Sequence, residues 1–520
     1  MVLQCEKPIT VWGWDTPGQQ VSVSFAEQSK SATTSKEGRW TITLDAQPSS
    51  FENRELIVSG SSKVSCSNVL VGEVWHCGGQ SNMEWTLRST RDADLELDSA
   101  NYPAIRYIRL PKVARPTPQD DFPVADNTSS EGNWKRCISP DVDNCSGVGY
   151  YFAKRLHRRL NAPVGLIDTS WGGTMAQHWC SKESLREIPA AKPYIDTFEG
   201  DLKEWLDGGG EKGAQQRLGT DMENWEKARD KAKAAGEREP RRPNPDSYTS
   251  PATKRQPAGM FNGMLSPIAQ YTVRGALFYQ GENNSFGSSW KPFPMTFPAV
   301  IKDWRAAIGD DNMPFGIIQI SGWSNRRSMT YDMNHHCNVT REVQFNTWRK
   351  ADNTGLIVTF DTNSNGSIHP ARKLPVGERS ARWALAEVYK VKVRGSNQPL
   401  QWKGPIYSSN EIRDAKVYIS FEDGSAAGLR LDQDIDVGFY IAGEDKEFHH
   451  ASARIDGNRV VVWSDAVPQP LSVRYAFSNL PAGGLMNGRE LPAYPFRTDD
   501  WPMTPHQSTG SYNADGTITD

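Results

Sequence analysis

The stretch at residues 76–85, H-C-G-G-Q-S-N-M-E-W, carries a serine in a setting that suits a nucleophile. Ser81 follows the apolar run 69–71 and a Gly-Gly pair, and it precedes a helix-compatible stretch. We therefore expect a tight turn from a strand into a helix, because glycine permits the positive φ values that such a turn needs. The N–H groups at the start of that helix could stabilise a developing oxyanion. A serine that merely caps a helix is the alternative.

Three further segments place polar groups directly after apolar runs. They are S-W-G-G-T at 170–174, Y-Q-G-E-N-N at 279–284 and G-S-I-H-P at 366–370. Segments of this kind gather at the carboxyl edge of a parallel sheet. Together with Ser81 they supply a hydroxyl, a histidine and several N–H donors, which are the groups that acyl transfer needs. Each segment alone could be a turn, a cap or a structural histidine, but the four together favour a hydrolase site.

These four blocks resemble those of the sialate O-acetylesterases, which are SGNH-type serine hydrolases. The family pattern reads G-Q-S-N-M-x-W, W-G-G-T, Y-Q-G-E and I-H-P, and the similarity extends to V-W-G-W at 11–14 and L-P-A-Y-P-F-R-T-D at 491–499. The resemblance implies an α/β protein with a three-layer, flavodoxin-like parallel sheet domain and flanking all-β domains. It also implies an esterase that removes O-acetyl groups from sugars, typically sialic acids, through an acyl-enzyme.

The resemblance assigns roles to residues of the four blocks. Ser81 is the expected nucleophile, and His369 is the expected general base and acid. Gly172 and Gln280 are the best matches for oxyanion donors, and Asn283 offers a further carboxamide.

The acid that orients the histidine is open. Many SGNH hydrolases carry Asp three positions before the histidine, where this chain has Gly366. Asp361, which directly follows an apolar run, is the first candidate, and Glu282 is the second. A backbone carbonyl of the 363–367 loop is the third possibility, and it would leave a Ser-His dyad.

Residues beside the motifs are candidates for binding the substrate: Gln80, Asn82, Trp171 and Arg372. A sialate substrate carries a carboxylate, so its site should present a cation or several N–H donors. By position in the sequence the candidate cations are Arg88, Arg372 and Lys373. Two other functions stay open: an acetylxylan or other plant-polysaccharide acetylesterase, and a non-catalytic sugar-binding protein on a hydrolase scaffold.

Composition narrows the possible partners. The 520 residues include 59 basic and 62 acidic side chains, so the net charge of -3 gives no sign of nucleic-acid binding. We find no apolar run of about 18 residues, and so expect no membrane span. The seven cysteines form no C-x-x-C pair, although Cys137 and Cys145 could bridge. We expect neither a cofactor nor a metal, and the expected partner is a small-molecule or glycan substrate bearing acetyl groups.

The pattern of apolar and polar residues along the chain predicts its domains. Residues 1–68 alternate in short runs and predict a β-sandwich-like domain, and residues 69–395 alternate strands with helices and predict the catalytic domain. A polar insertion at about 195–257 predicts an exposed helix and a Pro-rich loop, as a surface feature or a lid. Residues 396–500 predict a second β-rich domain, and 501–520 a disordered tail. The family usually begins behind a signal peptide, which this chain does not show, so we expect a secreted or periplasmic enzyme.

Overall fold

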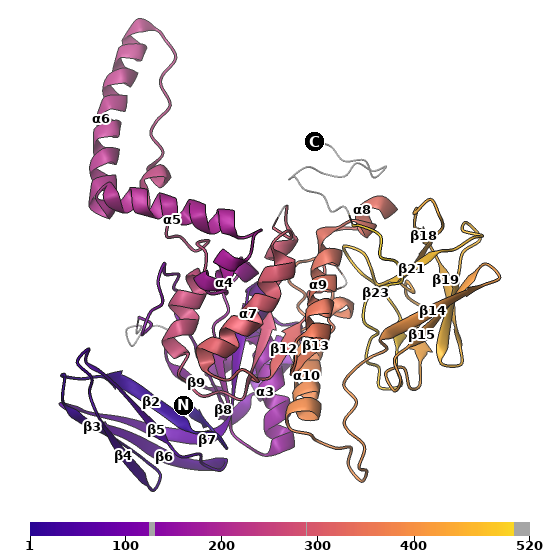
Figure 1. Cartoon of the computed structure of the whole chain (residues 1–520), viewed down its shortest axis with the longest axis horizontal. Coiled ribbons are helices and arrows are strands. Elements are labelled where there is room, and N and C mark those ends of the chain that lie inside the picture. Colours follow the sequence, from indigo (N-terminus) through magenta and orange to yellow (C-terminus); the bar gives the residue numbers. More distant parts are fainter. Residues whose placement is uncertain (124–130, 288, 364, 504–520) are drawn as a thin grey trace.

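The computed structural model describes residues 1–123, 131–287, 289–363 and 365–503. Its central feature is a sheet covered by helices, with an all-β part at the N-terminal end and another at the C-terminal end (Figure 1). The expected combination of an α/β unit with flanking β-rich parts is confirmed at this level. Most of the tail predicted at 501–520 lies outside the described residues.

The central sheet has the strand order β13-β12-β11-β7-β10-β8-β9. Six of these strands run parallel, and β9 is antiparallel to its neighbour β8. Their bounds are β7 Lys63–Gly79, β8 Asn101–Arg109, β9 Trp134–Ile138, β10 Val164–Asp168, β11 Gly275–Tyr279, β12 Phe315–Ile318 and β13 Thr354–Ile357. Because the strands are parallel, the polar segments that follow β7, β10 and β11 meet at one edge of the sheet.

Helices cover both faces of this sheet. One face packs against α7 (Phe293–Ile308) and α9 (His336–Lys350), and the other against α3 (Gly147–Leu160) and α10 (Leu374–Trp383). Shorter helices connect the elements: α1 Ser81–Glu84, α2 Ala93–Ser99, α4 Lys182–Glu187 and α8 Met329–Met333. Helix α10 ends at Trp383 and is followed directly by a π-helical turn at Ala384–Val388.

Alternate residues of β7 show how the two cores are built. His76 points to the α7 face and stacks on Trp304, with ring centroids 4.6 Å apart. Its neighbour Trp75 points to the opposite face and packs edge-on against Trp383 of α10, with centroids 6.0 Å apart. This period of two is what a strand buried on both faces requires.

The N-terminal part shares a strand with the central sheet. Its strands are β1 Val2–Gln4, β2 Ile9–Trp14, β3 Gln20–Phe25, β4 Gln28–Thr33, β5 Arg39–Leu44 and β6 Ser50–Ser59. Strand β7 is 17 residues long; its first half pairs with β6 and its second half with β10 and β11. The expected boundary at 68/69 therefore falls inside one strand, at Asn68, where a φ of +58° interrupts the extended backbone.

The C-terminal part is built from short antiparallel strands. They are β14 Tyr407–Arg413, β15 Lys416–Phe421, β16 Arg430–Leu431, β17 Phe439–Ala442, β18 His449–His450, β19 Ser452–Asp456, β20 Arg459–Trp463, β21 Ser472–Tyr475, β22 Leu485–Met486 and β23 Phe496–Arg497. They form two four-stranded sheets and one two-stranded sheet. This part packs beside α9 and α10 (Figure 1).

The polar insertion forms an arm that extends away from the sheet (Figure 1). Its helices are α5 Lys192–Asp207 and α6 Gly210–Ala235, and α6 ends at Gly236, whose φ of +67° is a typical left-handed stop. The chain then returns along α6, where Trp225 donates its indole N–H to Pro240 O at 3.0 Å. No helix in the described ranges is long and apolar enough to cross a bilayer.

Replacing Trp304 tests the packing of the α7 face. Trp304 is fully buried and contacts His76, Phe278 and Phe315. We expect Trp304→Ala to lower the free energy of unfolding by about 3–5 kcal/mol, because it leaves a large cavity in the core. Urea unfolding followed by circular dichroism measures this. Trp14→Ala is the control, since Trp14 is 47% exposed, and equal losses in both variants would contradict the packing described here.

Candidate active site

Ser81 lies at the turn from β7 into α1. Gly79, the last residue of β7, has φ +125°, and a Cβ atom there would lie 2.1 Å from Tyr279 O of β11. Only glycine fits this backbone, so β7 can approach β11 closely at the edge of the sheet. Ser81 is the first residue of α1 and is half-buried, as expected for a hydroxyl at the start of a short helix.

The structure brings Ser81 and His369 together. The Oγ atom of Ser81 is 2.7 Å from Nε2 of His369. The imidazole ring stacks on Trp85, with centroids 5.1 Å apart and an angle of 26° between the planes. The His369 backbone N–H donates to Oγ of Ser367 at 3.1 Å. A hydroxyl hydrogen-bonded to an imidazole nitrogen is the geometry that general-base activation of a serine requires.

Burial and two charged groups set the charge state of His369. Burial lowers the pKa of the imidazole, and so does the ammonium group of Lys373, while the carboxylate of Glu84 raises it. The balance lies below the usual value, so the ring is neutral near pH 7 and Nε2 can accept the serine proton.

The two acids proposed from the sequence are bound elsewhere. Both carboxylate oxygens of Asp361 accept hydrogen bonds from Arg379 of α10, at 2.7 and 2.6 Å. Glu282 is fully buried and accepts from the side-chain amides of Asn82, at 2.5 Å, and Gln80. Within the described residues, no hydrogen-bond acceptor is found for Nδ1 of His369, so the geometry favours a Ser-His pair held by stacking and backbone contacts.

The position where many SGNH hydrolases carry Asp is occupied by Gly366 in an unusual backbone conformation. Its φ is +71°, and its carbonyl oxygen accepts from Ser324 N at 3.0 Å. A Cβ atom at Gly366 would lie 2.7 Å from Ser324 O. An aspartate at this position would therefore require both strain and movement of the neighbouring loop.

A buried polar network lies beneath the nucleophile. The side-chain amide N–H₂ of Asn82 donates to Glu282 and to Ile368 O, at 2.5 and 2.8 Å, and its oxygen accepts from Lys373. Burial raises the pKa of Glu282 and lowers that of Lys373 to about 7. Gln80 and Asn82, proposed as substrate-binding residues, are thus buried structural partners of Glu282.

Gly172 is the oxyanion candidate that the structure places beside the nucleophile. A Cβ atom at Gly172 would lie 3.1 Å from Cβ of Ser81. Its N–H donates to Oε2 of Glu84 at 2.6 Å, and the other oxygen of Glu84 contacts Lys112 and Arg109. The oxyanion of an acyl group attached to Ser81 would therefore compete with Glu84 for this N–H.

The other two oxyanion candidates are bonded within the protein. Gln280 is fully buried and donates to Thr174 O at 2.8 Å and to Oε1 of Gln80 at 3.2 Å. Asn283 donates to Gly173 O at 3.1 Å. In this arrangement both carboxamides support the 173–174 turn.

The remaining predicted substrate contacts differ in exposure. Trp171 is partly buried, and Nζ of Lys254 lies 5.1 Å from the centroid of its ring. Arg372 is exposed and donates to Asp361 O at 3.3 Å, and Arg88 is also exposed. Lys373 is buried beneath the site and not at its mouth.

Sequence reasoning missed three residues of this site: Glu84, Trp85 and Lys254. The first two stand inside the block G-Q-S-N-M-E-W, so their spacing from Ser81 could have drawn attention to them. Lys254 lies in the return segment of the insertion, and no local pattern marks it. All seven cysteines are free thiols, including Cys137 and Cys145.

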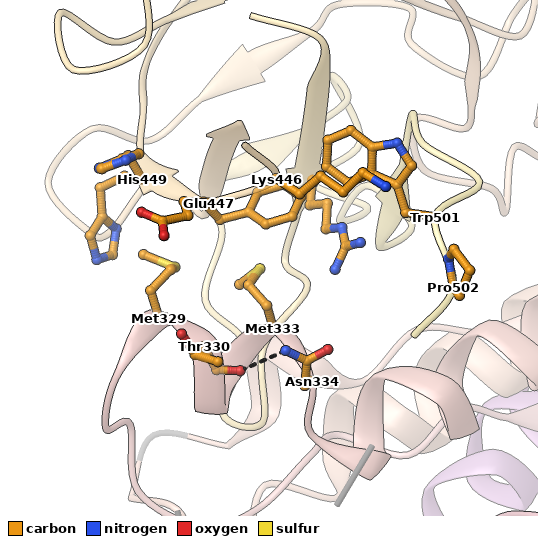
Figure 2. A pocket seen from close by; sticks show the side chains of 12 residues that line it. Met329, Thr330, Met333, Asn334, Lys446, Glu447, His449, Trp501 and Pro502 are labelled. Atoms are coloured by element: carbon orange, nitrogen blue, oxygen red, sulfur yellow. Dashed lines mark hydrogen bonds between the residues drawn. The ribbon is translucent and has the colours of Figure 1, made fainter. Parts of the chain in front are cut away.

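A cavity of about 730 Å³ lies apart from these groups, between α8 and the C-terminal β-rich part. Figure 2 shows Met329 and Met333 on one side and Lys446 and Trp501 on the other. None of its lining residues belongs to the four blocks. In the described part of the chain, no group of three or more His, Cys, Asp or Glu side chains forms a metal site.

The fold and the site together describe an α/β protein with a hydrogen-bonded serine and histidine at the carboxyl edge of its sheet. No family model matches the chain. The sialate O-acetylesterase of Mus musculus is 26% identical over 453 residues, which cover 81% of this chain and 79% of the mouse protein. The sialate O-acetylesterase of Homo sapiens is 25% identical over 441 residues, covering 79% of this chain and 72% of the human protein.

A solved structure is also similar over nearly the whole chain. It is a carbohydrate acetylesterase from Xanthomonas citri, with a TM-score of 0.76 and 28% identity, and the match covers 96% of this chain and 97% of that one. The comparisons confirm the resemblance to the sialate O-acetylesterases that the four sequence blocks indicate.

Replacing the two candidate acids tests the Ser-His arrangement. Losing the orienting acid of a serine protease triad costs about four orders of magnitude in turnover. Because Asp361 is bonded to Arg379, we expect Asp361→Asn to keep kcat within about tenfold while the melting temperature falls. Glu282→Gln should lose more activity, because the side-chain amides of Asn82 and Gln80 would lose a carboxylate acceptor and one of them would face the N–H₂ group of the new glutamine. A loss of about four orders in Asp361→Asn alone would identify Asp361 as the acid.

Glu84 gives a pH test. Catalysis needs neutral His369, so kcat/KM falls as the pH drops through the histidine pKa. Since Glu84 raises that pKa, we expect Glu84→Gln to shift the acid limb of the pH profile to lower pH by about half a unit. Glu211→Gln on the exposed arm is the matched control and should not shift it. If the acid limb of Glu84→Gln shifted to higher pH, a group other than His369 would control that limb.

Proposed function

We propose that this protein is a carbohydrate O-acetylesterase of the SGNH type that removes O-acetyl groups from sialic acids. The observation that carries the proposal is the 2.7 Å contact between Ser81 Oγ and His369 Nε2 at the edge of a parallel sheet. Relatives named sialate O-acetylesterase and a neighbour named carbohydrate acetylesterase support this substrate class. Resemblance to the family also leads us to propose a secreted or periplasmic location.

The proposed reaction starts at Ser81. His369 Nε2 takes the hydroxyl proton while Oγ attacks the acetyl carbonyl, and the carbonyl oxygen becomes an oxyanion. His369 then gives the proton to the departing sugar oxygen, and an acetyl group stays on Ser81. A water molecule then gives a proton to the same nitrogen and attacks the acetyl carbon. The bond from this carbon to Oγ breaks, His369 returns the proton to Ser81, and acetate leaves.

The oxyanion needs N–H donors near Ser81. The backbone N–H of Ser81 itself, in the first turn of α1, is one. The N–H of Gly172 is the second, once Glu84 moves toward Lys112 and Arg109, which its other oxygen already contacts. In this proposal Gln280 and Asn283 shape the turn that carries Gly172.

Two other functions remain to be tested against this one. An acetylxylan or other plant-polysaccharide esterase would use the same serine chemistry on a neutral sugar. A sugar-binding protein without catalysis was suggested by the absence of the usual Asp, but the contact between Ser81 and His369 speaks for catalysis. The three readings differ in what they predict for turnover and for substrate ranking.

Activity of Ser81→Ala tests the proposed reaction. We expect the protein to hydrolyse p-nitrophenyl acetate and Ser81→Ala to lose about three orders of magnitude or more in kcat, since removing a triad member costs at least this much. Acetylated sialic acid should be deacetylated faster than acetylated xylan at equal acetyl concentration. A variant as active as the parent would refute the mechanism, and the reverse ranking would favour the plant-polysaccharide function.

A further inference from the structure

The return segment of the insertion brings a lysine to the proposed oxyanion donor. The ammonium group of Lys254 donates a hydrogen bond to Gly172 O and lies 5.1 Å from the centre of the Trp171 ring. A Cβ atom at Gly173 would lie 3.4 Å from Nζ of Lys254. Gly172 is also packed against Ser81, so this glycine lies between Lys254 and the nucleophile. Lys254 thus links the return segment of the arm, which extends away from the sheet in Figure 1, to Gly172 and Trp171 of the site.

The charges around Lys254 do not cancel. Glu84 is paired with Lys112 and with Arg109, and within the described residues Lys254 forms no ion pair with a carboxylate. Asp168 lies deeper beside Arg109, at 3.7 Å, and burial raises its pKa. The mouth of the site therefore holds more positive than negative charge, and such a field attracts anionic substrates.

Lys254 also has free hydrogen-bonding capacity. An ammonium group has three donors, and Gly172 O takes one of them. The side chain is only partly buried, so the others can reach a ligand. Burial lowers the pKa of this lysine, and so do the positive charges of Lys112 and Arg255, while the carboxylate of Glu84 raises it.

We propose that Lys254 binds a carboxylate carried by the acetylated sugar, and that the insertion thereby gives the enzyme a preference for acidic over neutral acetylated sugars. The inference rests on the proposed esterase function and adds a residue that determines specificity. The cations expected from the sequence suit this role less well. Lys373 is buried and donates to Asn82, and Arg372 is exposed and bonded to Asp361 O.

Two substrates that differ in one charge test the proposal. They are an O-acetylated sialic acid and the same sugar with its carboxylate converted to a primary amide. We expect the parent protein to show a kcat/KM about tenfold higher for the acid, the factor expected for one charge-assisted hydrogen bond. Lys254→Met should bring the ratio close to one, and Lys254→Arg should keep part of the preference. The ratio cancels any effect of the substitution that is common to both substrates.

A matched control and two contrary results complete the test. Arg255→Gln removes the same charge one position along the chain, at an exposed residue, and should keep the ratio. A ratio in Lys254→Met equal to that of the parent, or no preference in the parent, would overturn the role of Lys254. Hydrolysis of p-nitrophenyl acetate by the parent protein separates the two proposals. If the parent hydrolyses this ester but shows no preference for the acidic sugar, only the specificity inference has failed. If the parent hydrolyses no ester, the esterase proposal itself has failed.

Discussion

The side chain of Asn82 is the point at which the elements of the site are joined. It bonds Glu282, which follows β11, Lys373, which precedes α10, and Ile368 O, which precedes the histidine. A buried carboxylate and a buried ammonium are costly, and this cost is offset only when their hydrogen bonds are satisfied. Asn82 forms a hydrogen bond with each of them through one amide, and Gln80 donates a further one to Glu282. Because it is the residue after Ser81, the nucleophile and His369 are held in register by the same group.

Large indoles packed on small strand residues hold the edge of the sheet in place. A Cβ atom at Gly78 would lie 2.3 Å from the ring of Trp304 on one face, and a Cβ atom at Gly355 would lie 2.1 Å from the ring of Trp383 on the other. Each helix can therefore approach the sheet closely, and a closely packed interior permits little movement because its compressibility is low. The turn after Gly79 is attached to this rigid edge. Rigidity suits a site whose N–H donors must be in position before the reaction begins.

Features of the site that depend on a local sequence pattern could be predicted. The hydrogen-bond partners of individual side chains could not, because residues far away in the sequence bind them. The proximity of Ser81 and His369 follows from blocks that end parallel strands, and each block could be seen locally. Asp361 also follows a strand, since β13 ends at Ile357, but Arg379 of α10 binds both of its oxygens. Nothing around Asp361 in the sequence reveals that partner. Gln80 and Asn82 were expected to face the substrate because they flank Ser81, whereas Glu282, 200 residues away, draws both inward.

In the proposed reaction, Gly172 connects the insertion to the chemistry as well as to the specificity. Its N–H faces the carboxylate of Glu84, and its carbonyl oxygen faces the ammonium of Lys254. When an oxyanion forms on Ser81 it meets the negative charge of Glu84 near the same N–H, and this repulsion opposes the reaction. The positive charge of Lys254 on the other side of the glycine offsets it. On this proposal one lysine favours both an anionic substrate and the anionic intermediate, because the carboxylate of the one and the oxyanion of the other lie beside the same peptide.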